Sequence, residues 1–464
     1  MTNKRFMTAS ICALLLGGMV GFHAFCDTTA VTADGVASGS TYVIAEASET
    51  DESPENTTDD TTGYTTGDMT DDVNDGTAAG QTDTAASGTG AEDDGSAASS
   101  DSSASTGALN TAELFTSRDL EQEADLSEAQ GVTVSSGEIV TIKTGGVYVI
   151  TGTATDAQIL VTASDEDKVQ LVLDGVSITN ESIPCIYIKS ADKVFVTTTE
   201  SDNTLSVTGT FTADGETNTD AVIFSKDDLV VNGKGTLNIS STDNGITSKD
   251  DLKVTGGTVN ITCSSDALEA NDSIRIADGT ISISTAKDGL HAENDEDNTV
   301  GYIYIAGGSL TVEAGDDAIH ATTIAQVDGG TLNLTGREGI EGTWIQINDG
   351  TISIAASDDG INAGQKSNIA TPTAEFNGGT ITIVMGSGDT DAVDSNGNLL
   401  INGGTLDITA QSPFDYDGAG QLNGGTLIVN GSETTALSNQ MMGGHGGMGG
   451  HGGMGGHGGR NGGW

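Results

Sequence analysis

The stretch DALEANDSIRIADGTISI, residues 266–283, holds three short runs in which apolar and polar residues alternate. Alternation with a period of two indicates strands that bury one side, and the Asp-Gly pair before the third run indicates a turn. The apolar pairs of the three runs are Leu268 with Ala270, Ile274 with Ile276, and Ile281 with Ile283. The stretch therefore predicts three short strands in close succession.

The same plan recurs along the chain. A glycine turn followed by Thr or Ser returns between Thr236 and Thr426 at intervals of 22, 22, 29, 22, 20, 29, 25 and 21 residues. A repeat of this length is typical of a solenoid, in which each unit buries its apolar side only against its neighbours. Three strands per coil of about 22 residues predict an all-β fold, a parallel β-helix. The crossover rule for parallel strands predicts a right-handed coil, and the longer intervals predict loops that bulge from it.

Two other repetitive β folds compete with this prediction. The calcium-binding nonapeptide roll has a period of about nine residues, so the spacing excludes it. A sandwich or propeller stays open because Asn-Gly and Asp-Gly pairs also form hairpin turns, but the fixed register of Gly-Gly-Thr favours the β-helix. Residues 112–219 also alternate and are predicted to be a β-rich N-terminal part of one domain, beginning with a cap at 112–130.

The regions outside the repeats have compositions of their own. Residues 1–26 carry Lys and Arg before a short apolar run and are interpreted as a signal peptide, with lipidation of Cys26 as an open alternative. Residues 27–110 are rich in Thr, Ser, Gly and acids, which predicts a disordered tether. The β-helix is predicted for residues 111–435. A Gly/His/Met-rich tail, residues 436–464, is interpreted as disordered rather than as a dedicated metal site.

The charge of the chain limits its partners. The formal net charge is −52, from 68 acidic against 16 basic residues. This charge repels nucleic acid and anionic membranes unless cations intervene, so we expect divalent cations as partners, no nucleic acid, and no membrane insertion after signal removal. Cys185 and Cys263 cannot form a disulfide framework for so large a domain, and we expect buried free thiols. The mature protein is expected to be an extracellular or cell-surface monomer.

One strand of each coil carries a polar residue between two inward aliphatic ones, as His291 lies between Leu290 and Ala292. These outward residues are Glu269, His291, His320, Glu341, Asn362 and Asp394. All of them can bind a cation or a hydroxyl group, and both histidines of the folded domain fall in this column. The pattern favours a ligand-binding face over a merely solvated one.

A second column consists of the acids that open these strands. Its members are Asp266, Asp288, Asp317, Glu338, Asp359 and Asp391. Because neighbouring strands lie about 4.8 Å apart, stacked carboxylates repel, and calcium could bridge them. The alternative is that the acids cap turns through backbone hydrogen bonds, and we expect capping for most of them and calcium ligation for a subset.

The acidic loop after His291 is the strongest single metal candidate. It contributes Glu293, Asp295, Glu296 and Asp297, although it lacks the spacing of an EF-hand. The alternative interpretation is a solvated acidic loop.

Several runs of the chain resemble a bacterial family, the carbohydrate-binding domain-containing proteins. The resemblance extends over residues 112–435 and rests on runs such as DAVIFSKDDL (220–229), SDALEANDSIRIADGT (265–280) and AKDGLHAEND (286–295). It implies a secreted right-handed parallel β-helix that binds calcium and cellulosic or acidic pectic polysaccharide and is similar to polysaccharide lyases. Only the Asp-Ala and Asp-Gly positions are carried over as candidate ligands.

Three functions stay open at this point. The sequence favours a calcium-dependent polysaccharide-binding protein, with Trp344 joining the outward column as a ligand residue. A polyuronate lyase needs a strong base, for which Arg337 and Lys287 are candidates, although ion pairs explain both residues equally well. Tyr302 and Tyr304 share one side of a strand and could form a small platform for sugar rings. A surface adhesin that binds no glycan is the third function.

Overall fold

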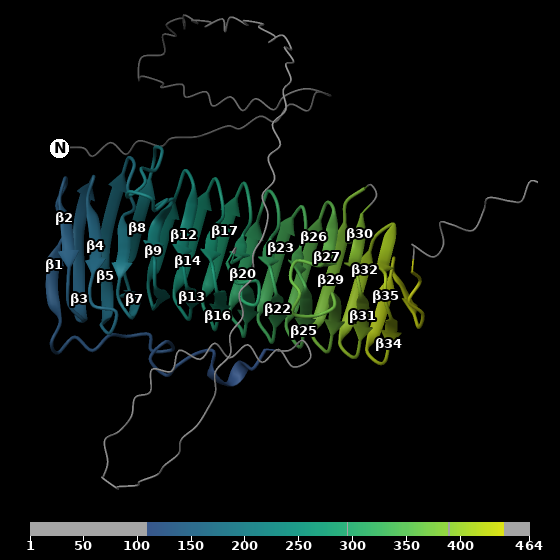
Figure 1. Ribbon diagram of the computed structural model, residues 1–464. Coiled ribbons are helices and arrows are strands. Elements are labelled where there is room, and N and C mark those ends of the chain that lie inside the picture. The colour runs from purple at the N-terminus through teal and green to yellow at the C-terminus, as the bar shows by residue number, and fades with distance from the viewer. Residues whose placement is uncertain (1–108, 295, 388–389, 440–464) are drawn as a thin grey trace, which may run out of the picture. The chain divides into compact units, whose positions relative to one another are not determined.

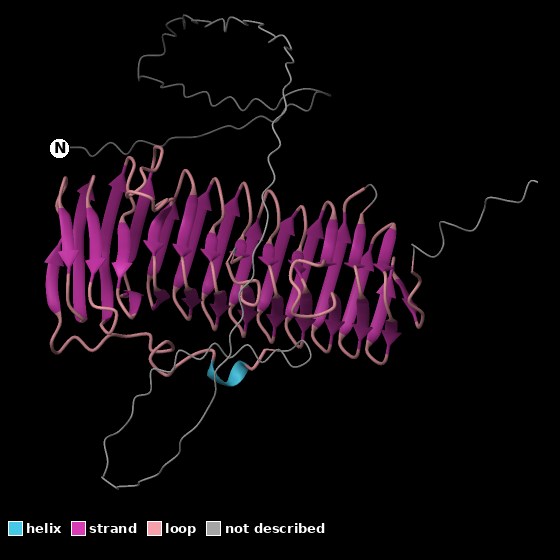
Figure 2. Ribbon diagram, viewed as in Figure 1, coloured by secondary structure: helices cyan, strands magenta, loops and turns pink. Residues whose placement is uncertain are grey.

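The computed structural model describes residues 109–294, 296–387 and 390–439 of the 464. In this part of the chain the structure is a β-solenoid whose only helical element is the 3-10 turn η1 (Thr111–Glu113), as Figure 1 and Figure 2 show. No helix among these residues is long and apolar enough to cross a membrane. The predicted signal peptide, nearly all of the tether and most of the tail lie outside the described residues.

Each coil contributes strands to three faces, which we number in chain order. Face 1 is a 12-stranded sheet. Its strands are β2 (Ile139–Ile142), β4 (Gln158–Thr162), β6 (Ile186–Ser190), β9 (Ala221–Ser225), β12 (Asn244–Ser248), β15 (Leu268–Ala270), β18 (Leu290–Ala292), β21 (Ile319–Ala321), β24 (Ile340–Gly342), β27 (Asp359–Ala363), β30 (Asp391–Ser395) and β33 (Ser412–Tyr416).

Faces 2 and 3 form one 24-stranded sheet because two long strands, β3 (Gly146–Thr155) and β5 (Lys168–Asn180), run through both faces. Face 2 contains β1 (Gln130–Thr133), β7 (Lys193–Thr198), β10 (Asp228–Gly233), β13 (Asp251–Val254), β16 (Ser273–Ile276), β19 (Tyr302–Ile305), β22 (Ile324–Val327), β25 (Trp344–Ile347), β28 (Thr373–Phe376), β31 (Asn398–Ile401) and β34 (Gly420–Leu422). Face 3 contains β8 (Asp202–Val207), β11 (Thr236–Ser240), β14 (Thr258–Cys263), β17 (Thr280–Thr285), β20 (Ser309–Glu313), β23 (Thr331–Gly336), β26 (Thr351–Ala356), β29 (Thr380–Met385), β32 (Thr405–Thr409), β35 (Thr426–Val429) and β36 (Ser432–Thr434).

The strand pairings confirm the parallel β-helix. Each strand of a face pairs in parallel with the equivalent strand of the next coil, as β15 does with β18 and β18 with β21. Among the named strands, antiparallel pairing occurs between β35 and β36. The sandwich and propeller alternatives are therefore wrong, because both need antiparallel neighbours throughout. The right hand of the coil stays a prediction from the crossover rule.

The core is a set of stacked aliphatic ladders, one on the inner side of each face. On face 1 the inward residues Leu268, Leu290, Ile319 and Ile340 lie one above another and are at most 1% exposed. Burying each such side chain stabilises the fold by about 1.5–3 kcal/mol. The first coils, from β1 to β8, continue the same solenoid, and Cys185 and Cys263 are free and buried as predicted.

The segment 109–129, which we call the strap, does not cap the end of the solenoid as the sequence suggested. It runs along the outside of face 2 across several coils (Figure 1). The backbone N–H of Leu109 donates to Gln326 on β22, and Arg275 on β16 donates to the carbonyl of Leu114. Nearer β1, the side chain of Gln122 donates to the carbonyl of Thr255. The strap thus ties together strands that are far apart in sequence.

A buried ion pair holds the centre of the strap. Asp119 is 0% exposed and lies 3.1 Å from the Nζ of Lys253 and 3.6 Å from that of Lys193. The predicted platform of Tyr302 and Tyr304 is also affected, because Phe115 of the strap packs against Tyr304, which is 6% exposed. The tyrosine pair is therefore not an open surface for sugar rings.

Candidate functional site

The predicted outward column exists on face 1 in continuous register. Each residue of the column pairs with the next, in the order Glu269, His291, His320, Glu341, Asn362 and Asp394. The register follows from the inward ladder, since a shift of one residue would turn the aliphatic side chains outward. The alternation in the sequence therefore predicted this column correctly.

The column is more enclosed than the sequence suggested. Glu341 is 3% exposed, and the side chains of His291 and His320 are both 15% exposed. Lys366, from the loop after β27, reaches Glu341 with its Nζ 2.5 Å from Oε1. The column is therefore not an exposed ladder at these positions, because His320 and Lys366 cover Glu341 and the two histidine rings stack on each other.

The leading acids cap the coils that follow them. One carboxylate oxygen of Asp266 accepts the backbone N–H of Asp288, and Asp288 accepts that of Asp317 in the same way, at 3.1 and 2.9 Å. Asp359 accepts the N–H of Asp391 at 3.2 Å. The capping interpretation is therefore confirmed at these three positions. Capping uses one oxygen of each acid and fixes the direction of the other.

The second oxygen of two of these acids holds a histidine. Oδ2 of Asp288 lies 2.7 Å from Nδ1 of His291, and Oδ2 of Asp317 lies 3.1 Å from Nδ1 of His320. The two imidazole rings stack, with centroids 4.7 Å apart and an interplanar angle of 15°. Neighbouring coils thus present a repeated Asp–His pair on face 1.

The charges around His320 favour its protonated form. Burial lowers the pKa of this imidazole, but hydrogen bonds to Asp317 and Glu341 outweigh burial and raise the pKa to about 10. Burial raises the pKa of Glu341, and the interactions with His320 and Lys366 reverse this and lower it. His320 and Glu341, 2.7 Å apart, therefore form an imidazolium–carboxylate pair.

Further along face 1, burial and neighbouring carboxylates raise the pKa values of several acidic side chains. Burial, with Glu341 nearby, raises the pKa of Glu338 to about 7. Burial followed by the charge of Asp394 raises that of Asp359 to about 7, and burial with Asp415 raises that of Asp394 to about 6. The carboxylates at this end of face 1 therefore repel one another, and added cations would relieve the repulsion.

The raised pKa values predict how stability depends on pH. A carboxyl group with a folded pKa above its unfolded value of about 4 stabilises the fold below that value and loses the contribution as pH rises through the folded pKa. Without divalent cations, we expect the free energy of unfolding to fall between about pH 4 and pH 7, by about 1.4 kcal/mol for each pH unit that separates the unfolded and folded pKa values of a group. Urea unfolding across this range measures the slope. A Glu338→Gln variant should flatten it, and a rise in stability over the range would contradict the account.

Among the described residues, four groups of side chains could hold a metal ion. The groups are Asp288 with Asp316 and Asp317; Asp266 with Asp288 and His291; Asp317 with His320 and Glu341; and His291 with Glu293 and His320. The first group offers carboxylate oxygens alone. Oδ1 of Asp317 is buried and makes no hydrogen bond among the described residues, and its ion-pair partner, Nη2 of Arg337, lies 3.7 Å away. An all-oxygen set with a buried oxygen that makes no hydrogen bond suits calcium, so these residues fit the ion that the sequence predicts.

The other predicted metal ligands have different surroundings. Asp359 and Asp391 belong to none of the four groups. Asp297 accepts the backbone N–H and the hydroxyl of Thr299, so it closes its own loop. Asp295 lies outside the described residues. Of the acidic loop, only Glu293 joins a group in the described part of the chain.

The candidate lyase bases are engaged in ion pairs. Arg337 lies 2.5 Å from both Asp316 and Asp358 and 2.9 Å from Glu338, and the hydrogen bond to Asp316 raises its pKa. Burial lowers the pKa of Lys287, but Asp266, at 3.0 Å, outweighs burial and raises it. Both groups are thereby held in the protonated state, in which neither can accept a proton.

The remaining predicted ligands divide between the column and another face. Glu269 accepts hydrogen bonds from Asn244, Thr247 and Lys249, and Asn362 donates to Glu338 and Glu341. Trp344 begins β25 on face 2 and pairs with Ile324 and Thr373, so it does not extend the column. Its Nε1 is buried without a hydrogen-bond partner among the described residues.

The sequence interpretation missed residues that complete the site. Asp316 and Lys366 lie in loops, and only their contacts place them beside the column. A further acidic corner joins face 1 to face 2, where burial followed by the charges of Asp228, Asp251 and Asp272 raises the pKa of Asp250 to about 7. The repeated Lys-Asp-Asp-Leu at residues 226–229 and 249–252 was a signal for this corner.

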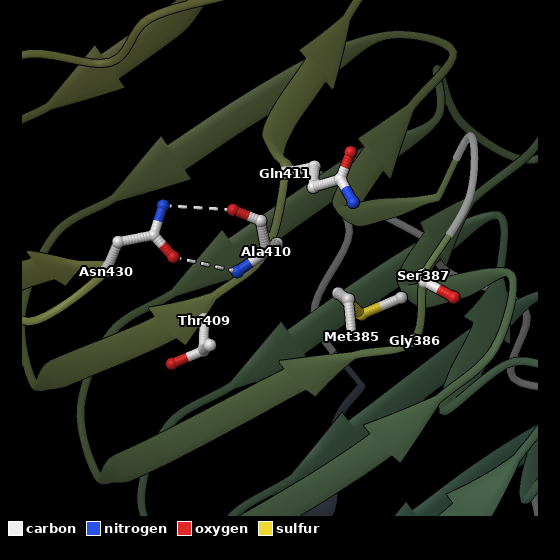
Figure 3. A pocket seen from close by; sticks show the side chains of 7 residues that line it. All are labelled: Met385, Gly386, Ser387, Thr409, Ala410, Gln411 and Asn430. Carbon is white, nitrogen blue, oxygen red and sulfur yellow. Dashed lines mark hydrogen bonds between the residues drawn. The ribbon is translucent and has the colours of Figure 1, made fainter.

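A hollow near the C-terminal coils lies away from this chemistry. Met385, Thr409, Gln411 and Asn430 are among its lining residues, and the amide of Asn430 bonds to both backbone groups of Ala410 (Figure 3). None of the lining residues is titratable. The hollow therefore offers no acid, base or strong metal ligand.

A family model and a curated relative both point to one family. The model of the family described as carbohydrate-binding domain-containing protein matches residues 136–390, more than half of the chain. A curated relative with this description, from Acetivibrio thermocellus, is 36% identical over 157 residues, which are 33% of this chain and 53% of the relative. The match thus spans about half the length of that relative. A solved structure, titled a polysaccharide lyase-like protein from C. thermocellum in a gadolinium derivative, is 30% identical, with a TM-score of 0.41, over 47% of this chain and 98% of that one.

Proposed function

The chain belongs to the family of carbohydrate-binding domain-containing proteins, and from this premise we propose that it binds polysaccharide through face 1 in a calcium-dependent manner. The protein would act outside the cytoplasm, on the cell surface or secreted. Acidic polysaccharide of the pectic type is the first candidate ligand, and a cellulosic glucan is the second.

The observation that carries the proposal is the carboxylate group of Asp288, Asp316 and Asp317, with a buried oxygen that makes no hydrogen bond among the described residues. These three residues would hold calcium, which supplies positive charge and open oxygen-binding positions. A chain of net charge −52 repels a polyuronate, so the charge must be reversed locally before such a ligand can approach. Calcium between protein and sugar carboxylates does this.

The shape of face 1 supports an extended ligand. Its polar column repeats once per coil, at the spacing of parallel strands of about 4.8 Å, and so places polar side chains along a line, of which Glu269, Asn362 and Asp394 are partly exposed. Carboxylate and amide side chains also accept and donate hydrogen bonds to sugar hydroxyls. A neutral glucan could use these groups without calcium, which separates the two candidate ligands.

Binding to a panel of polysaccharides tests the proposal. The full chain with calcium should be retarded in native gels that contain polygalacturonate, and its retention on cellulose measures the second candidate. A bovine serum albumin lane controls for sieving. No retention by any polysaccharide would overturn the proposal in favour of an adhesin. Appearance of the ultraviolet absorbance of unsaturated uronate during incubation would instead support the lyase alternative.

A further inference from the structure

One cluster on face 1 has a donor set that calcium does not prefer. His291 and His320 stack in neighbouring coils, and Nε2 of His291 lies 3.1 Å from Oε2 of Glu293. The ligand atoms of these three residues all lie within 4.8 Å of one another. Calcium takes oxygen ligands, whereas two imidazoles with one carboxylate suit zinc and its neighbours among the transition metals.

The carboxylates behind the rings give the cluster a second feature of a metal centre. Nδ1 of His291 is bound to Asp288, and Nδ1 of His320 is bound to Asp317 and Glu341. In metal sites a carboxylate commonly holds one ring nitrogen in this way, which orients the ring and leaves the other nitrogen to bind the metal. Here both neighbouring histidines have this support, because the Asp–His pair repeats from coil to coil.

We propose that Nε2 of His291, Nε2 of His320 and the carboxylate of Glu293 form a zinc-binding site, in which the metal ion displaces the Nε2 proton of each ring into solvent. Ligand atoms of a tetrahedral zinc ion are about 3.4 Å apart, so closing the observed spread requires shifts of little more than about 1 Å, by tilting of the stacked rings. Glu293 lies in the loop after β18 and is exposed, which allows it to adjust. Three protein ligands leave the fourth position open to water or to an oxygen of a bound sugar.

The proposed zinc site and the proposed calcium group have different ligand residues and bind different ions. It shares Asp288 and Asp317 only as supports of the histidine rings. Its test therefore uses spectroscopy and metal stoichiometry, and no polysaccharide. A failure of glycan binding would leave this result unchanged, and the reverse also holds.

Cobalt(II) titration of the full chain tests the site directly. The tail histidines, His445, His451 and His457, are first replaced by serine so that they cannot bind the metal. We expect one equivalent of cobalt to give the intense visible absorption of tetrahedral coordination, and zinc to remove this absorption while millimolar calcium does not.

Variants at the cluster locate the bound ion. His291→Gln and His320→Gln should each abolish the absorption, and Glu293→Gln, at an exposed position that does not threaten folding, should weaken cobalt binding by about 10-fold or more. Glu296→Gln, in the same loop, is the matched control and should change nothing. The proposal is overturned if cobalt gives only the weak spectrum of the hydrated ion, or if the tetrahedral spectrum survives in all three cluster variants.

Discussion

Removal of calcium is expected to lower the affinity for polygalacturonate by about 100-fold or more. Each charge-assisted contact to a sugar carboxylate contributes about 1.5–3 kcal/mol, so the loss of two contacts accounts for this factor before repulsion is added. Repulsion lowers the affinity further, because face 1 without calcium presents acidic side chains to the sugar carboxylates. Glu338 and Asp359 are two of these acids, and their pKa values are raised to about 7. Isothermal titration of oligogalacturonide, in calcium and then in chelator, measures the difference.

An Asp317→Asn variant shows whether the predicted group holds the ion. Asp317 supplies the buried oxygen that makes no hydrogen bond among the described residues, so this variant should bind oligogalacturonide weakly even in calcium. Asp202→Asn, an exposed acid on face 3, removes the same charge and should bind as the wild type does. Equal affinities in calcium and chelator would show that calcium does not mediate the contact.

Replacement of Asp119 by alanine is expected to lower the free energy of unfolding by about 3–5 kcal/mol. Removing one partner of a buried ion pair leaves the other charge buried without compensation, here Lys253 beneath the strap, whereas Lys193 keeps Asp228 at 3.1 Å. Lys253 is buried at 4% exposure and cannot reach water unless the strap lifts. Chemical denaturation gives the free energy, and proteolysis within residues 123–129 reports whether the strap has detached.

The pKa of Asp119 also predicts the pH below which the strap detaches. Burial raises the pKa of Asp119, but Lys253, the N–H of Thr116 and Lys193 outweigh burial and lower it. A lowered folded pKa means that the stabilisation is present above the unfolded value of about 4 and is lost as pH falls through the folded one. Proteolysis of the strap should therefore increase only below about pH 4. Glu121→Gln changes an exposed acid of the strap and is the control for Asp119→Ala. Equal losses of stability in these two variants would refute the role of the buried pair.

The fold was predictable because every coil of a solenoid repeats the same pattern of apolar and polar residues. Inward residues such as Leu268, Leu290 and Ile319 recur once per coil, and alternation around them sets both the strand and its register. The path of the strap was not predictable in this way. Residues 109–129 contact the coils through single side chains, such as Asp119 and Gln122, and these contacts have no period.

The candidate site was predictable to the same extent. Register placed His291 beside His320 and Asp288 beside Asp317, because these residues repeat with the coils. Loop contacts do not repeat, so the sequence could not show that Lys366 covers Glu341. Trp344 follows Glu341 closely in the chain, but the corner after β24 carries it to another face. The repeat period and the alternation of apolar and polar residues therefore specify the column, and the loops determine how much of it is exposed to solvent.

The measurement that tests the central claim most directly compares faces 1 and 3 with the same pair of substitutions. Asn362→Ala with Asp394→Asn changes the column on face 1, and Asn333→Ala with Asp407→Asn changes outward positions on face 3. Both variants carry the same two changes, one Asn to Ala and one Asp to Asn, and so lose the same single charge. In calcium, we predict that the face 1 variant binds oligogalacturonide about 10-fold or more weakly, while the face 3 variant binds as the wild type does. A loss of affinity in the face 3 variant alone would contradict the assignment of polysaccharide binding to face 1.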